Sequence, residues 1–480
     1  MTDTPIIVWF RRDLRIADNA ALSAAVATGR PVLPVFILDD DAAGDRCAGA
    51  ASRWWLHYSL EALGRSIAEL GGTLVLRRGE AGGLLAKIAK ESGADAVYCS
   101  RSYEPWAAGR ERALHDRLES SGIELKRFVG TLMHEPERLT TKAGGPFKVY
   151  TAFWRALRQQ VDEARPLKAP SKLNAPASIP KSEALASWKL LPTKPDWAAG
   201  LRDAWHPGEE GARKRLSSFV SKDLKDYADE RNRPDHASTS RLSPHLAFGE
   251  VSPRQCWFAA RAANGRLEGA DTGCETFLKE LAWREFSAHL LHHWPHFPEK
   301  PFREEFAAFP WSKSKAHLKA WQRGQTGYPI VDAGMRELWA TGWMHNRVRM
   351  IVASFLIKDL MLPWQDGEQW FWDTLVDADL ANNSASWQWV AGSGADAAPY
   401  FLIFNPVTQG ETFDPEGAYV RRWVPELAKL PPKAIHAPWL ASEEVLAKAK
   451  VTLGKTYPAP IVDHSEARQA ALAAFKGLKS

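Results

Sequence analysis

Residues 326–389 combine charged side chains, apolar helix-like stretches and many tryptophans. An unpaired charge inside such a stretch would be costly, so each charge needs a partner or a ligand. A structural helix requires neither the charges nor the indoles, whereas a redox site that holds a large polar cofactor could use both. The charged residues are Asp332, Arg347, Arg349, Asp377 and Asp379, and the tryptophans are Trp339, Trp343, Trp364, Trp370, Trp372, Trp387 and Trp389.

A second candidate site is the run Thr239-Ser240-Arg241-Leu242-Ser243-Pro244. Its hydroxyl and backbone N–H groups gather just before an expected helix. The start of a helix offers free N–H donors and the positive end of the helix dipole, which suits a diphosphate. A plain helix N-cap would give the same pattern, so spacing alone leaves both interpretations open.

The first 132 residues alternate apolar β-branched runs with stretches rich in Ala, Leu and charge. This order predicts an α/β domain with a Rossmann-like parallel sheet covered by helices on both faces. No GxGxxG follows the first strand, so the common dinucleotide fingerprint is missing. The expected strands are Ile6–Phe10, Val32–Leu38, Thr73–Leu76, Ala96–Cys99 and Ile123–Phe128.

Residues 133–200 are predicted to be an interdomain linker, because Ala164–Lys194 is rich in Pro, Lys, Ser and Ala and has weak periodicity. Residues 201–480 show helical spacing almost throughout and predict an all-α domain. The clearest expected helices are Cys274–His292, Ala333–Leu338 and Val348–Leu360. Of the 22 tryptophans only four precede residue 133, so the composition changes at the same boundary.

The composition limits the class of protein. A content of 45% hydrophobic and 25% charged residues is ordinary for a globular protein, and a net charge of +5 allows a polyanionic partner without requiring one. Four scattered cysteines without a CxxC pair disfavour a zinc or iron–sulfur site and favour free thiols in a reducing compartment. No signal peptide precedes the first strand, and no apolar run reaches the ~18 residues of a membrane helix. We therefore expect a cytoplasmic monomer that binds no metal and no membrane.

Several stretches resemble the photolyase/cryptochrome family, flavoproteins that use blue light. The matching runs are TGYPIVDAGMREL, NRVRMIVASFLIKDL and DADLANNSASWQW, and WFRRDLRIADNAAL matches the family's opening. The resemblance extends over nearly the whole chain and implies an FAD-binding C-terminal domain at 201–480 and an antenna-binding domain at 1–132. Within this family, the sequence most resembles a bacterial class I-type cyclobutane pyrimidine dimer photolyase, a lyase that repairs damaged DNA with light.

The resemblance implies a set of FAD contacts. Arg349 and Asp377 would pair beside the isoalloxazine ring, where a nearby cation favours a reduced, anionic flavin. Asn383 would face flavin N5, because an amide cannot deprotonate there. A structural ion pair and a hydrogen-bonded core Asn would look the same in sequence. The implied cofactor-binding residues are Tyr227, Thr239, Ser240, Arg241, Leu242, Ser243, Phe277, Arg284, Arg349, Asp377, Asp379 and Asn383.

The resemblance also implies a pocket for a flipped-out lesion. Trp283 and Trp389 match its aromatic walls, and Glu280 matches the acid that hydrogen-bonds to the pyrimidines. Asn346 and Met350 lie four apart on one helical face, where the enzymes that repair (6-4) lesions place two histidines. The implied catalytic residues are Glu280, Asn346, Met350 and Asn383, and the implied DNA contacts are Arg231, Glu280, Trp283, Asn346, Arg347 and Trp389, with Arg233 a further phosphate candidate.

Electron transfer and light harvesting are implied in the same way. Trp311, Trp364 and Trp387 match the family's tryptophan chain, although core packing is the ordinary use of Trp. The antenna residues of the best-known bacterial branch are poorly matched near Tyr103–Trp106, where Glu104 could hold a pterin or could be a plain surface acid. We expect 5,10-methenyltetrahydrofolate, with 8-hydroxy-5-deazaflavin as the alternative. Leu402 stands where close bacterial repair enzymes carry Arg, which removes a possible lesion contact.

Three other functions compete with dimer repair. A cryptochrome photoreceptor is disfavoured by Asn383, by the retained lesion-pocket residues and by the lack of a long signalling tail. A (6-4) photolyase is disfavoured by Asn346 and Met350. A helical DNA-binding protein without flavin would purify colourless. An absorption spectrum of the isolated protein would best separate these possibilities.

Overall fold

The computed structural model describes residues 4–161, 165–397 and 401–478. They form two compact units. Unit 1 comprises Met1–Lys225, Ser240–Pro295 and Val376–Ala381, and unit 2 comprises Asp226–Thr239, His296–Leu375 and Asn382–Ser480. The domain boundaries predicted after residues 132 and 200 remain predictions.

Unit 1 contains a five-stranded parallel sheet in the order β3-β2-β1-β4-β5. The order reverses direction between β1 and β4, which makes this edge the topological switch point of the sheet. The predicted α/β fold is confirmed. The strands are β1 (Ile6–Phe10), β2 (Val32–Leu38), β3 (Val75–Arg78), β4 (Ala96–Ser100) and β5 (Glu124–Phe128).

The register of the sheet explains two local features. β3 starts two residues later than predicted because its pairing with β2 begins at Val35 and Val75. Pro34 lies inside β2, opposite Val8 of β1. Because pairing with β3 starts only at the next residue, the missing N–H of Pro34 falls outside that ladder.

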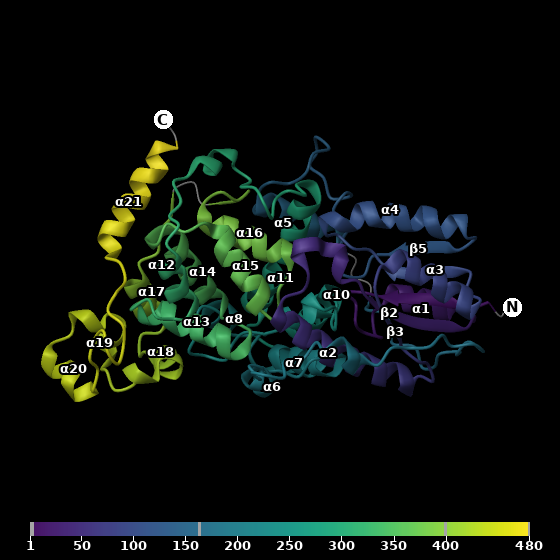
Figure 1. The fold of residues 1–480 in the computed structure, drawn as a ribbon, viewed down its shortest axis with the longest axis horizontal. Helices are drawn as coiled ribbons and strands as arrows, with labels where there is room; N and C mark the ends of the chain where they lie inside the picture. The colour runs from purple at the N-terminus through teal and green to yellow at the C-terminus, as the bar shows by residue number, and fades with distance from the viewer. Residues whose placement is uncertain (1–3, 162–164, 398–400, 479–480) are drawn as a thin grey trace. The chain divides into compact units, whose positions relative to one another are not determined.

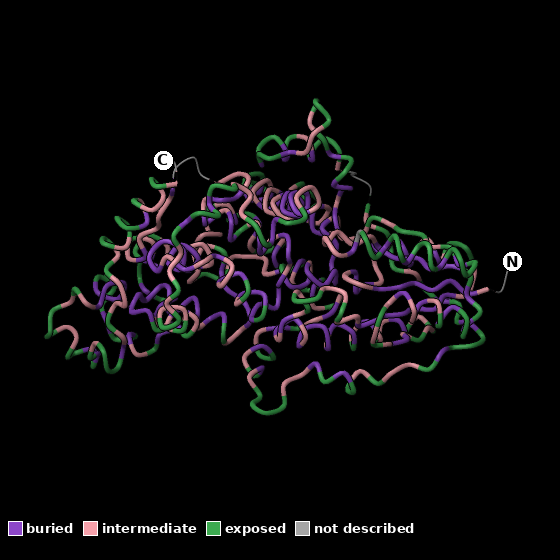
Figure 2. Tube along the Cα trace, turned by 45° about the horizontal axis from the view of Figure 1, so that its top comes forward, coloured by how far each residue is buried: buried purple, intermediate pink, exposed green. Residues whose placement is uncertain are grey.

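Apolar side chains cover both faces of the sheet. One face packs Ile7, Val35 and Val97 against Ile88 of α3 (Ala81–Ser92) and Leu118 of α4 (Pro105–Ser120). On the opposite face, α1 (Ala20–Ala27) contacts β1, β4 and β5 (Figure 1). Figure 2 shows the central strands as buried along their length, as expected for a parallel sheet between helices.

Most of the other helices of unit 1 pack against one another. The 23-residue α11 packs against α5 and α10, and α7 packs against α2 and α10. These helices are α2 (Ala50–Glu69), α5 (Tyr150–Gln160), α6 (Ala199–Ala204), α7 (Glu209–Lys222), α9 (Ser243–Ala247), α10 (Pro253–Asn264) and α11 (Asp271–His293).

The described residues of unit 2 form helices joined by loops, with one isolated β-bridge between Leu453 and Tyr457, and the predicted helical C-terminal domain is confirmed. α13 packs against α14, α17 and α18, and Figure 1 shows α13 and α14 side by side. The helices are α8 (Tyr227–Glu230), α12 (Lys315–Gln322), α13 (Pro329–Thr341), α14 (Asn346–Ser354), α15 (Trp364–Thr374), α16 (Leu380–Ala391, from Asn382 on in unit 2), α17 (Pro406–Phe413), α18 (Ala418–Trp423), α19 (Pro432–Ile435), α20 (Glu443–Ala449) and α21 (His464–Gly477).

The helix predicted at Val348–Leu360 is divided in the structure. α14 ends at Ser354 and passes into a π-helical turn over Phe355–Asp359, where the N–H of Leu360 donates to the carbonyl of Phe355 at 3.0 Å. This wider turn carries Lys358, whose side chain is fully buried. Because burial disfavours the charged amine, the pKa of Lys358 lies well below its usual value. Periodicity does not reveal such a turn, since it adds one residue to an apolar helix.

Candidate functional site

The run predicted to be a phosphate loop leads into α9 of unit 1. The hydroxyl of Ser240 accepts from the N–H of Leu242 at 3.4 Å, and α9 begins at Ser243. Arg241 has a φ of 49°, in the left-handed region, and its guanidinium lies 4.4 Å from the centre of the Trp205 ring. The turn therefore gathers hydroxyl groups at a helix start, and its binding of phosphate stays a prediction.

The buried carboxylate of Glu250 links α9 to two other segments of unit 1. Glu250 accepts from the N–H of Gly208 at 2.7 Å and from the indole N–H of Trp55 at 3.0 Å, and it lies 2.5 Å from Nδ1 of His245 in α9. Each hydrogen bond compensates the cost of burying the charge. Sequence patterns alone did not reveal Glu250, although an acid in the apolar run AFGEV was the available signal.

Arg12 joins α9 to the short segment Val376–Ala381 of unit 1. Its guanidinium donates to the carbonyls of Ala247 at 3.3 Å and Ala378 at 3.5 Å. Ala378 lies between Asp377, which is buried, and Asp379, which is half-buried. Arg12, in the opening WFRRDLR, thus contacts the backbone between two predicted cofactor ligands that lie far away in sequence.

α11 carries four predicted site residues. Phe277, Glu280 and Arg284 follow one another at intervals of three and four, so they share one face of the helix. Phe277 is buried, whereas Glu280 and Trp283 are half-buried. Arg284 donates to the carbonyl of Thr131 at 2.9 Å. One helix therefore places an acid, an indole and a guanidinium group within two turns.

In unit 2, the start of α14 presents three predicted lesion and DNA contacts. Asn346 is exposed and Met350 half-buried, one turn apart. His345 caps the helix, because its Nδ1 accepts from the N–H of Arg347 at 3.2 Å, and its own N–H donates to Glu337 at 3.3 Å. Burial and nearby guanidinium groups lower the pKa of His345 to about 4. The imidazole is therefore neutral near pH 7, and the cap is retained.

Two guanidinium groups meet beside this helix start. Arg347 donates to Asn232 at 2.9 Å and stacks over the Phe413 ring at 4.4 Å. Burial and the like charge of Arg231 lower the pKa of Arg347. Arg231 in turn lies over the ring of Tyr227, 5.6 Å from its centre. An anion at this position would relieve the repulsion, which suits a phosphate.

Arg349, Thr239 and Arg233 occupy other positions in unit 2. Arg349 donates from Nε to the carbonyl of Met344 at 2.8 Å. Thr239 is half-buried at the end of its segment, and Arg233 forms an ion pair with Asp235 at 2.6 Å. Pairing of Arg349 with Asp377 stays a prediction.

The amide of Asn383 has a defined orientation. Its Nδ2 donates to the backbone carbonyl of Glu368 at 2.9 Å and to the Glu368 carboxylate at 3.1 Å. Both side chains are buried. Because a carbonyl and a carboxylate only accept, the NH2 group must face Glu368, and Oδ1 is the group available to a ligand.

The three predicted electron-transfer tryptophans all lie in unit 2. Trp364 and Trp387 are each 2% exposed, and Trp311 is half-buried. The N–H of Ser312, next to Trp311, donates to the carbonyl of Met361 at 2.7 Å, three residues before Trp364. The surface indole is thereby held near the start of α15. Trp389, the second predicted wall, is half-buried two residues after Trp387.

Two family models match the chain. The family described as "DNA photolyase" matches residues 6–171, and "FAD binding domain of DNA photolyase" matches residues 277–477. The chain is 53% identical to the deoxyribodipyrimidine photo-lyase of Agrobacterium fabrum, over 99% of this chain and 98% of that protein. The chain belongs to the DNA photolyase family.

Solved and curated relatives define the branch less sharply. A bacterial class III photolyase from Agrobacterium tumefaciens superposes with a TM-score of 0.96 at 53% identity, covering 100% of this chain and 98% of that one. Cryptochrome-1 of Arabidopsis thaliana is 41% identical over 96% of this chain and 69% of its own length. The resemblance to the photolyase/cryptochrome family is thus confirmed, whereas the class I-type assignment is not.

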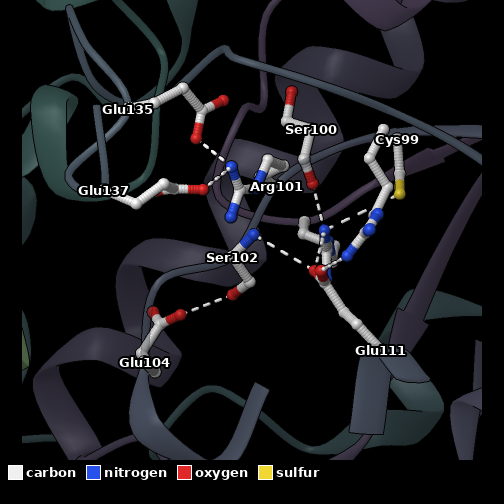
Figure 3. A network of polar contacts seen from close by, with 10 residues as sticks. Cys99, Ser100, Arg101, Ser102, Glu104, Glu111, Glu135 and Glu137 are labelled. Carbon is white, nitrogen blue, oxygen red and sulfur yellow. Dashed lines mark hydrogen bonds and ion pairs between the residues drawn. The ribbon is translucent and has the colours of Figure 1, made fainter. Parts of the chain in front are cut away.

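In this photolyase-family chain, the switch point of the sheet is occupied by ion pairs (Figure 3). Arg11, directly after β1, pairs with Glu111 of α4 at 2.9 Å and donates to the carbonyl of Ser100. Arg101, directly after β4, pairs with Glu137 at 2.6 Å and with Glu135. The two arginines that follow these strands are therefore paired with glutamates at the edge where α/β folds usually bind ligands.

Glu104, the predicted antenna ligand, lies at the rim of this network. It is the N-cap residue of α4, accepts from the hydroxyl of Ser102, and lies 3.5 Å from Nε of Arg12. Trp106 and Tyr103 are half-buried nearby in sequence.

The carbonyl of Leu402 lies 3.4 Å from Nζ of Lys358. Among the described residues, no helix has the length and apolar character to cross a membrane.

Proposed function

We propose that this photolyase-family enzyme repairs cyclobutane pyrimidine dimers in DNA, in a light-driven reaction without net redox change. The observation that carries the proposal is the start of α14. Asn346 and Met350 lie there on one accessible face, beside the Arg231–Arg347 pair. Neither side chain is an acid or a base, so these two positions offer no group for a proton transfer, while the guanidinium pair suits a backbone phosphate.

Reduced FAD, when bound, supplies the electron that splits the dimer and takes it back afterwards. Residues of this chain would hold and orient the reactants. The hydroxyl run before α9, with Arg284, Asp377 and Asp379, would hold the cofactor. Oδ1 of Asn383 would accept from an N–H of the reduced ring, because Glu368 keeps the amide nitrogen turned away.

Glu280 and Trp283 would receive the lesion. Both lie on α11 and are half-buried, so a ligand can reach them. Glu280 would hydrogen-bond to the pyrimidines of the bound lesion. Trp283 would replace part of the stacking that the dimer loses when it leaves the duplex, and we propose the same kind of role for Trp389.

Trp311, Trp364 and Trp387 would serve photoreduction of an oxidised cofactor. Two of these indoles are almost completely buried, and the third is accessible to an external reductant. Their role precedes repair, so an enzyme that is already reduced would repair without them.

We propose 5,10-methenyltetrahydrofolate as the second chromophore. The rim position of Glu104 supports a pterin held by a carboxylate, while the ion pairs of Arg11 and Arg101 occupy the switch point where a larger ring system would otherwise bind. Extraction of the purified protein and mass spectrometry would distinguish folate from deazaflavin. A cytoplasmic monomer remains our expectation.

A repair assay tests the main proposal. The chemically reduced protein is mixed with an oligonucleotide that carries one cyclobutane dimer and is illuminated with blue light. We expect restored pyrimidines in the light and none in the dark. A parallel oligonucleotide with a (6-4) lesion should remain unrepaired. Light-dependent spectral changes without repair of either lesion would favour a photoreceptor, a possibility supported by the 41% identity to Cryptochrome-1.

A further inference from the structure

Tyr150 and Trp283 form an aromatic stack with almost complete overlap in unit 1. Their ring centroids are 3.6 Å apart, and the ring planes differ by 4°. Aromatic pairs in protein cores prefer offset or edge-to-face arrangements with centroids about 4.5–7 Å apart. An offset or edge-to-face pair would be sufficient to pack α5 against α11. A parallel stack does something more specific, because it fixes the plane of the indole.

The same tyrosine also holds the backbone below the indole. The hydroxyl of Tyr150 donates to the carbonyl of Lys279 at 2.6 Å. In an α-helix that carbonyl accepts from the N–H four residues later, which is the N–H of Trp283. Lys279 also directly precedes Glu280. One side chain therefore fixes the ring of Trp283 and the helical turn that carries the predicted lesion acid.

A third ring restrains the stack from the side. Phe286 approaches Tyr150 at 5.9 Å and 69°, and Trp283 at 5.9 Å and 70°. Tyr150 is 8% exposed, whereas Trp283 is half-buried. One face of the indole is thus covered by a buried tyrosine, Phe286 packs against it from the side, and part of Trp283 stays accessible.

We propose that Tyr150 is a positioning residue that preforms Trp283 as a wall for the lesion. This inference rests on the proposed function. A dimer that leaves the duplex gains most from a surface that is already planar and immobile, since ordering a free indole at the moment of binding would reduce the affinity. Tyr150 removes that freedom in advance and does not itself contact the lesion.

The test compares Tyr150→Leu and Tyr150→Phe with the wild type in binding to a dimer-containing and an undamaged oligonucleotide. Leu removes the stack, and we expect about 3- to 10-fold weaker binding of the dimer, the range that aromatic pair energies allow. Binding of undamaged DNA and the yield of repair per bound lesion should be unchanged. Phe keeps the stack, and we expect its dimer affinity within about 2-fold of the wild type.

A matched control separates wall positioning from helix packing. Phe153 lies one turn later on α5, is fully buried and packs against Phe286 of α11, with 5.1 Å between the ring centroids. Phe153→Leu loosens the same helix pair but leaves the stack between Tyr150 and Trp283 in place. Its dimer affinity should therefore stay near that of the wild type. An equal loss with Phe153→Leu, or an equal loss with Tyr150→Phe and Tyr150→Leu, would overturn the proposal.

A double-mutant cycle supplies the decisive readout. If Tyr150 acts through the indole, Tyr150→Leu should not weaken dimer binding further in a Trp283→Leu background. Additive losses would contradict this. Flavin content and thermal unfolding confirm that each variant is folded. A wild-type protein that neither binds nor repairs dimers would refute the proposed function, whereas normal repair with an unaffected Tyr150→Leu would refute this inference alone.

Discussion

Gly367 leaves the space that the indole of Trp387 fills. A Cβ at Gly367 would lie 2.1 Å from Cη2 of Trp387 and 2.7 Å from a methyl carbon of Leu356. Gly367 lies on α15, three residues after Trp364 and therefore on the same side of the helix. The glycine thus lets the indole of Trp387 pack directly against α15, the helix that carries Trp364.

Gly367→Ala should slow photoreduction without preventing repair by reduced protein. The added methyl group displaces the Trp387 ring, and overpacking of this kind lowers the free energy of unfolding by about 1–3 kcal/mol. The rate of flavin reduction under blue light with an external thiol should fall several-fold. Repair after chemical reduction should match the wild type, because the electron chain is then bypassed.

The matched control for this variant is Gly109→Ala. Gly109 lies in α4, and a Cβ there meets nothing within 4 Å. Its photoreduction rate should be unchanged, and its helix should gain up to about 1 kcal/mol from the better helix former. Wild-type photoreduction in Gly367→Ala would show that the position of the Trp387 indole does not matter for electron supply.

Glu368→Gln should destabilise the reduced cofactor. The carboxylate is the acceptor that keeps the NH2 group of Asn383 turned toward Glu368. A glutamine can donate at that position, so only the backbone carbonyl of residue 368 still favours this orientation of the Asn383 amide. Losing one well-oriented hydrogen bond costs about 1 kcal/mol, which would lower a one-electron potential by about 40 mV. Spectroelectrochemical titration measures this shift, and exposed Asp373 on the same helix offers Asp373→Asn as a control without a shift.

The sheet could be predicted from sequence because its information is local. Runs such as Ile6–Phe10 and Val32–Leu38 are β-branched and buried on both faces, and both strands occur with the predicted boundaries. β3 shifted by two residues because its ends are set by pairing with β2, which no local pattern encodes. The π-helical turn at Phe355–Asp359 was missed for a similar reason, since periodicity continues across it.

The supports of the site were harder to predict than its contacts. Asn383 and Trp283 stand in runs that resemble a family, so the sequence could nominate them, and their roles stay predictions. Glu368, Tyr150 and Arg12 act through contacts with residues far away in the chain, and their types have many ordinary surface or core uses. Only the folded structure brings such partners together. The role of Glu368 was therefore inferred from its hydrogen bonds to Asn383 and not from the sequence.

Arg347→Gln should weaken binding to damaged and undamaged DNA alike and reduce its salt dependence. Its guanidinium stands beside Arg231, and burial together with that like charge lowers the pKa of Arg347, so an anion bound there would stabilise the charged group. Removing one phosphate contact should reduce the slope of log K against log salt by about 1. Exposed Arg323 provides the control Arg323→Gln, with an unchanged slope. A change confined to dimer-containing DNA would argue against a phosphate contact.

His345 should make the protein less stable as the pH falls from about 6.5 to about 4. An unfolded histidine has a pKa of about 6.5, whereas burial beside guanidinium groups lowers the pKa of folded His345 to about 4. Between these values the unfolded state binds more protons, so the free energy of unfolding decreases with decreasing pH. At pH 5 the loss from this residue should be on the order of 2 kcal/mol.

Urea unfolding of the wild type and of His345→Asn at about pH 7.5 and pH 5 measures this effect. Asn is a good N-cap residue, so it can accept from the N–H of Arg347 and preserve α14, but it does not titrate. The variant should therefore lose less stability than the wild type over this range, by the amount assigned to His345. Equal losses in both proteins would mean that other buried groups, such as His289 with its pKa lowered to about 3, account for the acid sensitivity.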